Sequence, residues 1–219
     1  MSQRRKSTIK PWVIEMTMTA ILATLIILMT FTPIGYIPIG PVKMTLLTLP
    51  VAVGSIVLGT RSGLILGTLF GLTSFYTCFG LDAFGNILLN LDYPAVLISP
   101  DIHFSISPVL CAVMCIVPRF FCGFLPALIY KAISKNGTKN TMIAIPVAAA
   151  STAIINTVLF ITSLWAFFNY SLTELIGTNN LFTMFATIAG INGLIEIAVN
   201  IIVGTAICKP LIEVKKRLV

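Results

Sequence analysis

Long apolar stretches alternate with short polar, proline-rich or glycine-rich segments along the chain of 219 residues. A helix needs about 20 mainly apolar residues to cross a bilayer. Six stretches predict transmembrane helices at about residues 12–31, 45–59, 62–80, 107–131, 141–169 and 180–208. The second stretch is short, and Pro50 is expected to kink it because proline removes a helical hydrogen bond. We therefore expect it to need the preceding loop to complete the crossing.

The loop at residues 32–45 reads TPIGYIPIGPVKMT, in which prolines and glycines lie close together. Proline lacks an amide proton and glycine tolerates φ > 0, so this segment is expected to form neither a regular helix nor a central strand. Its remaining side chains are mostly apolar, which predicts that the loop packs onto the bundle. We interpret residues 32–44 as an outer gating loop, with Gly35 and Gly40 as candidate hinges.

The composition is that of an integral membrane protein. Hydrophobic residues make up 57% of the chain and charged residues only 10%, with a mean hydropathy of +1.01. A soluble domain carries about 25% charged residues. We therefore predict an all-α, multi-pass protein of the cell membrane, with residues 1–219 forming a single transmembrane domain. The five cysteines lack the spacing of a metal site, and we interpret them as buried free thiols.

The basic residues predict the orientation of the six helices, because cytoplasmic loops of membrane proteins are enriched in Lys and Arg. Twelve of the fourteen fall on one side of the six-helix arrangement: Arg4, Arg5, Lys6, Lys10, Arg61, Lys131, Lys135, Lys139, Lys209, Lys215, Lys216 and Arg217. Both termini are then cytoplasmic, and the net charge of +7 reflects topology rather than binding to nucleic acid. The long outer loop at residues 81–106 is apolar enough to be expected to fold against the bundle.

Small residues form a stripe on the third predicted helix, where Gly63, Gly67 and Gly71 recur at intervals of four. Residues at this spacing share one helix face, and small ones let two helices approach closely. We expect this stripe to pack within the bundle.

Polar groups inside apolar helices are costly, so each one is a candidate for function. Arg119 lies in the fourth helix and Asn156 in the fifth, while Asn192 and Glu196 share one face of the sixth with Asn200. Arg119 and Glu196 are at comparable depth, which leaves two interpretations open. They form a structural ion pair, or the guanidinium binds a carboxylate or phosphate of a ligand. Lys43 in the gating loop is a membrane-interface anchor or a further contact for an anion.

Sequence motifs of enzymes are missing from the chain. The stretch from Gly35 to Lys43 has the spacing G-x4-G-x2-K rather than that of a nucleotide-binding loop, and no catalytic triad or metalloprotease motif is present. We therefore expect no enzyme activity, no metal and no cofactor in this chain. In particular, we expect no ATPase activity in this chain.

Four stretches together carry a family resemblance: TPIGYIPIGPVKMTLLTLPV, GSIVLGTRSGLILGTLFGLTSF, PRFFCGFLPALIYK and NGLIEIAVN. The chain resembles the S components of energy-coupling factor (ECF) vitamin transporters, most closely the pantothenate- and riboflavin-type branch, with pantothenate preferred. The resemblance implies a six-helix bundle with a high-affinity vitamin site near the outer face. It also implies a membrane coupling subunit and two cytoplasmic ATPases as partners.

The family resemblance also suggests site residues. The candidate substrate-binding residues are Arg119, Asn156, Asn192, Glu196, Tyr36, Lys43, Tyr93 and Asn90. Family members carry an AxxxA face on the first helix for the coupling subunit, which here corresponds to Thr19 with Ala23 and Ala20 with Thr24. Pantothenate suits a pocket with a cation and asparagines, whereas riboflavin needs a broad aromatic slot. A stand-alone carrier or channel using Arg119 and Glu196, and a membrane scaffold without a ligand, remain as alternatives.

Overall fold

The computed structural model describes residues 10–32, 34–39, 42–78, 107–135, 138–176, 180–186 and 190–218. The elements are, in order, helix α1 (Pro11–Thr30), strands β1 (Tyr36–Ile39) and β2 (Val42–Thr45), and helices α2 (Thr48–Val57), α3 (Thr60–Cys78), α6 (Ser107–Ser134), α7 (Thr138–Ile176) and α8 (Leu181–Met184). The last span consists of α9 (Gly190–Val199), the π-helix η2 (Asn200–Gly204) and α10 (Thr205–Leu218). The predicted outer loop at residues 81–106 lies outside the described residues.

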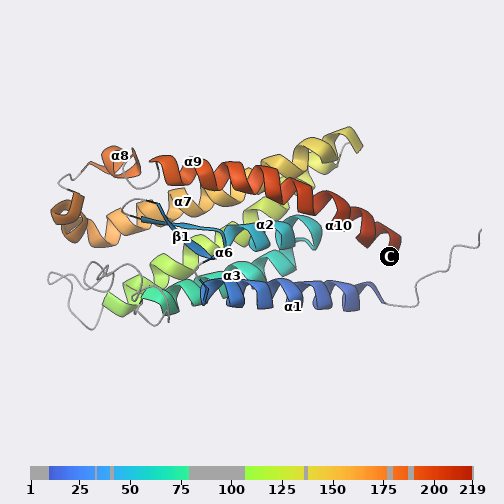
Figure 1. Ribbon diagram of the computed structural model, residues 1–219, viewed down its shortest axis with the longest axis horizontal. Helices are drawn as coiled ribbons and strands as arrows, with labels where there is room; N and C mark the ends of the chain where they lie inside the picture. Colours follow the sequence, from blue (N-terminus) through green and yellow to red (C-terminus); the bar gives the residue numbers. More distant parts are fainter. Residues whose placement is uncertain are drawn as a thin grey trace, which may run out of the picture.

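The helices form an elongated bundle, and Figure 1 shows that α1 begins at the same end at which α10 finishes. We call this the terminal end. The C-terminal end of α6 and the N-terminal end of α7 also lie there. The two strands and α8 lie toward the opposite end, which we call the hairpin end. Many large apolar side chains are exposed on the outside of the bundle, including Ile21, Ile65 and Leu194, as expected for a protein surrounded by lipid.

Four of the described helical segments are long and apolar enough to cross a membrane: Pro11–Thr30, Val109–Ser134, Asn140–Phe167 and Asn192–Lys215. Helix α2 is shorter, with ten residues, and α3 has 19 residues but is less apolar. The structure therefore supports a helical membrane protein with four candidate spans.

The proline-rich loop contains a short antiparallel hairpin that the sequence did not predict. Tyr36 pairs with Thr45 and Pro38 with Lys43 across β1 and β2. The prolines exclude a central strand, but in a two-stranded ribbon each strand has a free edge where a missing amide proton costs no ladder bond. The loop is therefore regular over two segments of four residues, and the other described elements are helical, as the predicted all-α class requires.

Helix α2 lies in the middle of the bundle, and all but one of its residues, Leu49, are buried. Such all-round burial is typical of a core helix. The predicted kink at Pro50 was wrong, because Pro50 is the third residue of the helix. Amide protons in the first turn have no partner within the helix, so proline removes nothing there. The helix ends at Val57, and Gly59, two residues later, has a φ of 97° that lets the chain turn directly into α3.

Two predicted helix ends need correction. Helix α7 runs to Ile176, so most of the expected outer loop beyond residue 169 is helical, and its 39 residues span about 58 Å at 1.5 Å per residue. Polar residues there indicate where the chain leaves the apolar layer, and no helix-breaking residue occurs before Gly177. For the sixth predicted helix, at 180–208, the structure describes α8 and then α9, η2 and α10, which extend from Gly190 to Leu218, ten residues beyond the predicted end.

Helices α3 and α6 approach each other closely along the glycine stripe. A methyl group added to Gly63 would collide with the carbonyl oxygen of Gly123, and one added to Gly67 with that of Arg119. At Gly71, an added Cβ would lie 2.9 Å from the Cα of Ile116. We call Gly63, Gly67, Gly71 and Gly123 the glycine seam. The expectation that this stripe packs within the bundle is confirmed.

We predict that Gly67→Ala destabilises the protein by about 1–3 kcal/mol, because the new methyl group must push two helix backbones apart. The matched control is Gly190→Ala, since an added Cβ at Gly190 meets no atom within 4 Å. Thermal unfolding in detergent would measure both. A Gly67→Ala variant as stable as wild type would show that the seam is not close-packed.

Candidate functional site

Polar side chains from five elements meet inside the otherwise apolar bundle. We call this set the polar layer: Thr48 of α2, Arg119 of α6, Asn156 of α7, Glu196 of α9 and Asn200 of η2. Each is at most 7% exposed. Polar groups at such depth need partners, because an unpaired one costs several kcal/mol in hydrocarbon. The contacts of each member therefore decide what the layer can do.

Arg119 is held between two aromatic rings. Its guanidinium carbon lies 4.4 Å from the ring centre of Phe160 and 5.4 Å from that of Phe70, within the range of cation–π attraction. One terminal nitrogen donates to the carbonyl of Met114 at 3.2 Å. Met114 lies five residues closer to the start of α6, so the side chain extends toward the hairpin end. The Nε atom is buried and has no hydrogen-bond partner within the described part of the chain.

Glu196 lies near Arg119 but does not pair with it. Among the described residues, no ion pair within 4.0 Å joins the two, while the ion pair that does occur links Lys215 to Glu15. The Glu196 carboxylate instead accepts a long hydrogen bond of 3.5 Å from Asn156 Nδ2. The hydroxyl of Thr48 is a further neighbour. The interpretation of Arg119 and Glu196 as a direct ion pair is therefore not supported, and the guanidinium keeps hydrogen-bonding capacity.

Asn200 joins the last span to α2. Its Nδ2 donates both to Thr48 Oγ1 at 3.0 Å and to the carbonyl of Glu196 at 2.9 Å. Sequence reasoning did not select Thr48, although a threonine directly before the apolar stretch of α2 is typical of a helix start. It also missed Phe70 and Phe160, because ordinary core aromatics carry no sequence signal for packing on a cation.

The remaining predicted contacts come from the loops and from α9. Tyr36 lies in β1, Lys43 in β2 opposite Pro38, and β2 packs against α9, the helix that carries Asn192 and Glu196. The structure therefore brings the hairpin to the helix that carries part of the polar layer. Tyr93, Asn90 and Gly40 lie outside the described residues.

Gly35 is held in place by its neighbours. An added methyl group there would collide with the carbonyl of Met29, its amide donates to Thr32 O at 3.3 Å, and its carbonyl accepts from Leu46 N at 2.9 Å. These contacts are those of an anchor between α1 and the hairpin. They give no support to the expectation that Gly35 acts as a hinge.

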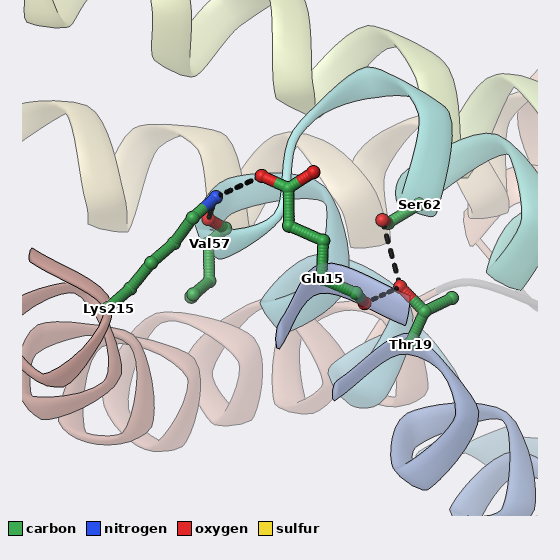
Figure 2. Close-up of polar contacts among 5 residues, drawn as sticks. All are labelled: Glu15, Thr19, Val57, Ser62 and Lys215. Atoms are coloured by element: carbon green, nitrogen blue, oxygen red, sulfur yellow. Dashed lines mark hydrogen bonds and ion pairs between the residues drawn. The ribbon is translucent and has the colours of Figure 1, made fainter. Parts of the chain in front are cut away.

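The candidate docking residues on α1 divide into two sets. Thr19 is buried, and its hydroxyl hydrogen-bonds to Ser62 of α3 at 2.9 Å and to the carbonyl of Glu15 at 2.7 Å (Figure 2). Ala23 is half-buried, whereas Ala20 and Thr24 are exposed. The pair of small residues on the outer surface of α1 is therefore Ala20 and Thr24.

The site offers hydrogen-bonding and ionic chemistry in a nearly dry environment. Among the described residues, no group of three or more His, Cys, Asp or Glu side chains could hold a metal ion. One cation, one carboxylate and two amides within an apolar bundle suit a small polar molecule that carries both an anionic group and hydrogen-bonding groups.

Residues 15–208 match the family model described as the substrate-specific component of the ECF transporter. The chain belongs to this family of S components. The match covers the hairpin and every member of the polar layer, and it confirms the resemblance seen in the sequence. Members of the family are transporter subunits, so this S component is a membrane protein that works with an ECF module.

Among curated proteins, the S component is similar to the pantothenic acid transporter PanT of Lactococcus lactis subsp. cremoris (strain MG1363). The two are 31% identical over 181 residues, which is 81% of this chain and 82% of PanT. The similarity therefore extends over most of both proteins.

Proposed function

We propose that this S component binds pantothenate from outside the cell and delivers it through an ECF importer. The observation that carries the proposal is the buried guanidinium of Arg119, which forms no ion pair with any carboxylate of the described residues, in a chain related to PanT. A buried cation without a counter-ion is costly, and a ligand carboxylate would remove that cost.

The polar layer complements the groups of pantothenate one by one. The carboxylate would bind the Arg119 guanidinium, which presents planar donors suited to a carboxylate. The two hydroxyls and the amide would bind Asn156 and Glu196, because a carboxylate accepts hydrogen bonds and an asparagine both accepts and donates them. The Asn156 Oδ1 atom is buried and accepts no hydrogen bond from the residues that the structure describes. Asn192, Lys43 and Tyr36, with Tyr93 and Asn90 of the outer loop, remain candidates for further contacts.

We propose that α2 and α3 also cross the membrane, which gives six spans with both termini in the cytoplasm. Two features support this topology. Helix α1 begins and α10 finishes at the same end of the bundle (Figure 1), as an even number of spans requires. Exposed basic residues gather in segments at or near that end: Lys10, Arg61, Lys131, Lys135 and Lys209. The hairpin end then faces outward, where the hairpin would retain the ligand.

Import would require a membrane coupling subunit and two ATPases, with ATP used by those partners. We propose that the coupling subunit docks on the face of α1 that carries Ala20 and Thr24, because small exposed residues allow a partner helix to approach closely. Thr19 faces Ser62 inside this chain and is left out of that surface.

We predict that the purified chain binds pantothenate with micromolar or tighter affinity, and that Arg119→Met weakens this binding about 10- to 100-fold. This range corresponds to about 1.5–3 kcal/mol for a hydrogen bond to a charged group. Panthenol, in which an alcohol replaces the carboxylate, should bind wild type and variant with similar affinity. Isothermal titration of both ligands would measure these effects, and retained panthenol binding would show that the variant is folded.

The outcomes separate the alternatives. Equal loss of both ligands in Arg119→Met would contradict a carboxylate–guanidinium contact. Binding of riboflavin instead of pantothenate would assign the other vitamin of this branch. Pantothenate uptake by liposomes that contain this chain alone would favour a stand-alone carrier.

We predict that Ala20→Trp abolishes co-purification with a tagged coupling subunit while pantothenate binding is unchanged, because the indole would hold the two helices apart. Val158→Trp is the matched control, since Val158 is an exposed residue of α7. Equal recovery of the complex with wild type and Ala20→Trp would exclude this face of α1.

A further inference from the structure

Helix α2 is tied to the last span near both of its ends. At its start, Thr48 Oγ1 accepts a hydrogen bond of 3.0 Å from Asn200 Nδ2, between residues 152 positions apart in sequence. At its end, the carbonyl of Val57 accepts from Lys215 Nζ at 3.1 Å, and Figure 2 shows the same ammonium group paired with Glu15. The two ties differ in environment: Thr48 and Asn200 are almost fully buried, whereas the Lys215 and Glu15 side chains are 24% and 42% exposed.

The hydrogen bond between Thr48 and Asn200 lies directly at the base of the hairpin. Strand β2 ends at Thr45, and only two residues separate it from Thr48. Those two are held as well, because Leu46 N donates to Gly35 O at 2.9 Å and Leu47 N to Thr45 Oγ1 at 3.3 Å. A movement of Thr48 would therefore also move β2, because both connecting residues are hydrogen-bonded.

On the other side of the tie, Asn200 holds the turn that carries Glu196. Its single amide nitrogen donates to Thr48 and to the carbonyl of Glu196, so both amide protons are used. Asn200 is also the first residue of the π-helix η2, and short π-helices within α-helices are frequent at functional sites. One side-chain amide thus connects the base of the hairpin to the backbone of a proposed ligand-binding residue.

We propose that Thr48 and Asn200 are a positioning pair that fixes the hairpin over the polar layer and thereby sets how long pantothenate stays bound. This role rests on the proposed function for its ligand, but the positioning itself is a property of the ligand-free chain. The pair acts through the hairpin and Glu196, because Thr48 Oγ1 and Asn200 Nδ2 are already engaged in hydrogen bonds within the chain. The hydrogen bond from Lys215 to the carbonyl of Val57 lies at the terminal end and does not position the hairpin.

The test compares Thr48→Val, which keeps the shape but removes the hydroxyl, with Thr48→Ser, which keeps the hydroxyl, and with Lys215→Met, which cuts the other tie of α2. Hydrogen exchange without ligand would report on peptides that cover residues 34–49. Release of radiolabelled pantothenate into excess unlabelled ligand would give the dissociation rate. We expect Thr48→Val to speed exchange in these peptides and to raise the dissociation rate about three- to tenfold, the effect of one neutral hydrogen bond.

Thr48→Ser and Lys215→Met should both leave the exchange rate of these peptides and the dissociation rate of pantothenate near their wild-type values. Two results would overturn the positioning pair: unchanged exchange in Thr48→Val, or changes of equal size in Lys215→Met, which would show that any tie of α2 has this effect. Faster exchange in a protein whose wild type does not bind pantothenate would contradict the proposed ligand and leave the positioning of the hairpin intact.

Discussion

The close approach of α3 and α6 along the glycine seam is the constraint on which the rest of the structure depends. Carbonyl oxygens of α6 lie where side chains of α3 would otherwise be, and one of them belongs to Arg119. The seam therefore sets the depth and direction of the Arg119 backbone. Ser55 of α2 adds a third helix to this contact, because its hydroxyl donates to Gly123 O at 2.8 Å. Helices α2, α3 and α6 are thus packed against one another around Gly123.

The polar layer is stable in this apolar bundle because its members share few, directional contacts. Two aromatic rings and one carbonyl surround the Arg119 guanidinium, and Asn200 uses one amide group to satisfy both α2 and its own helix. Several buried side-chain atoms, including Arg119 Nε and Asn156 Oδ1, form no hydrogen bond with the described residues. Such incomplete satisfaction is rare in a purely structural polar network and is what a site prepared for a polar ligand requires.

Much of the fold could be predicted from the sequence, because apolar length and glycine spacing are direct consequences of the bilayer and of close helix packing. The stripe at Gly63, Gly67 and Gly71 is an example, and the depth of Arg119 relative to Glu196 is another. The hairpin could not be predicted, since the rule that excludes proline from central strands does not apply to a two-stranded ribbon. The end of α7 was placed too early because polarity marks the edge of the membrane and not the end of a helix.

The sequence also identified the charged members of the polar layer, but not how they are paired. Counting residues from the outer end of each predicted helix places Arg119 and Glu196 at a comparable depth. Only the packing of Phe70 and Phe160 around the guanidinium shows that it is held by rings rather than by the carboxylate. Thr48 was missed for a similar reason. Its partner Asn200 is 152 residues away in sequence, and no local pattern connects them.

The central claim is that this S component holds pantothenate in the polar layer, and native mass spectrometry of the purified chain tests it most directly. A ligand bound this deeply in an apolar bundle should survive purification from cells supplied with both pantothenate and riboflavin. The account predicts a chain that carries the added mass of one pantothenate. A chain that carries riboflavin, or that remains without added mass after incubation with pantothenate, would contradict it.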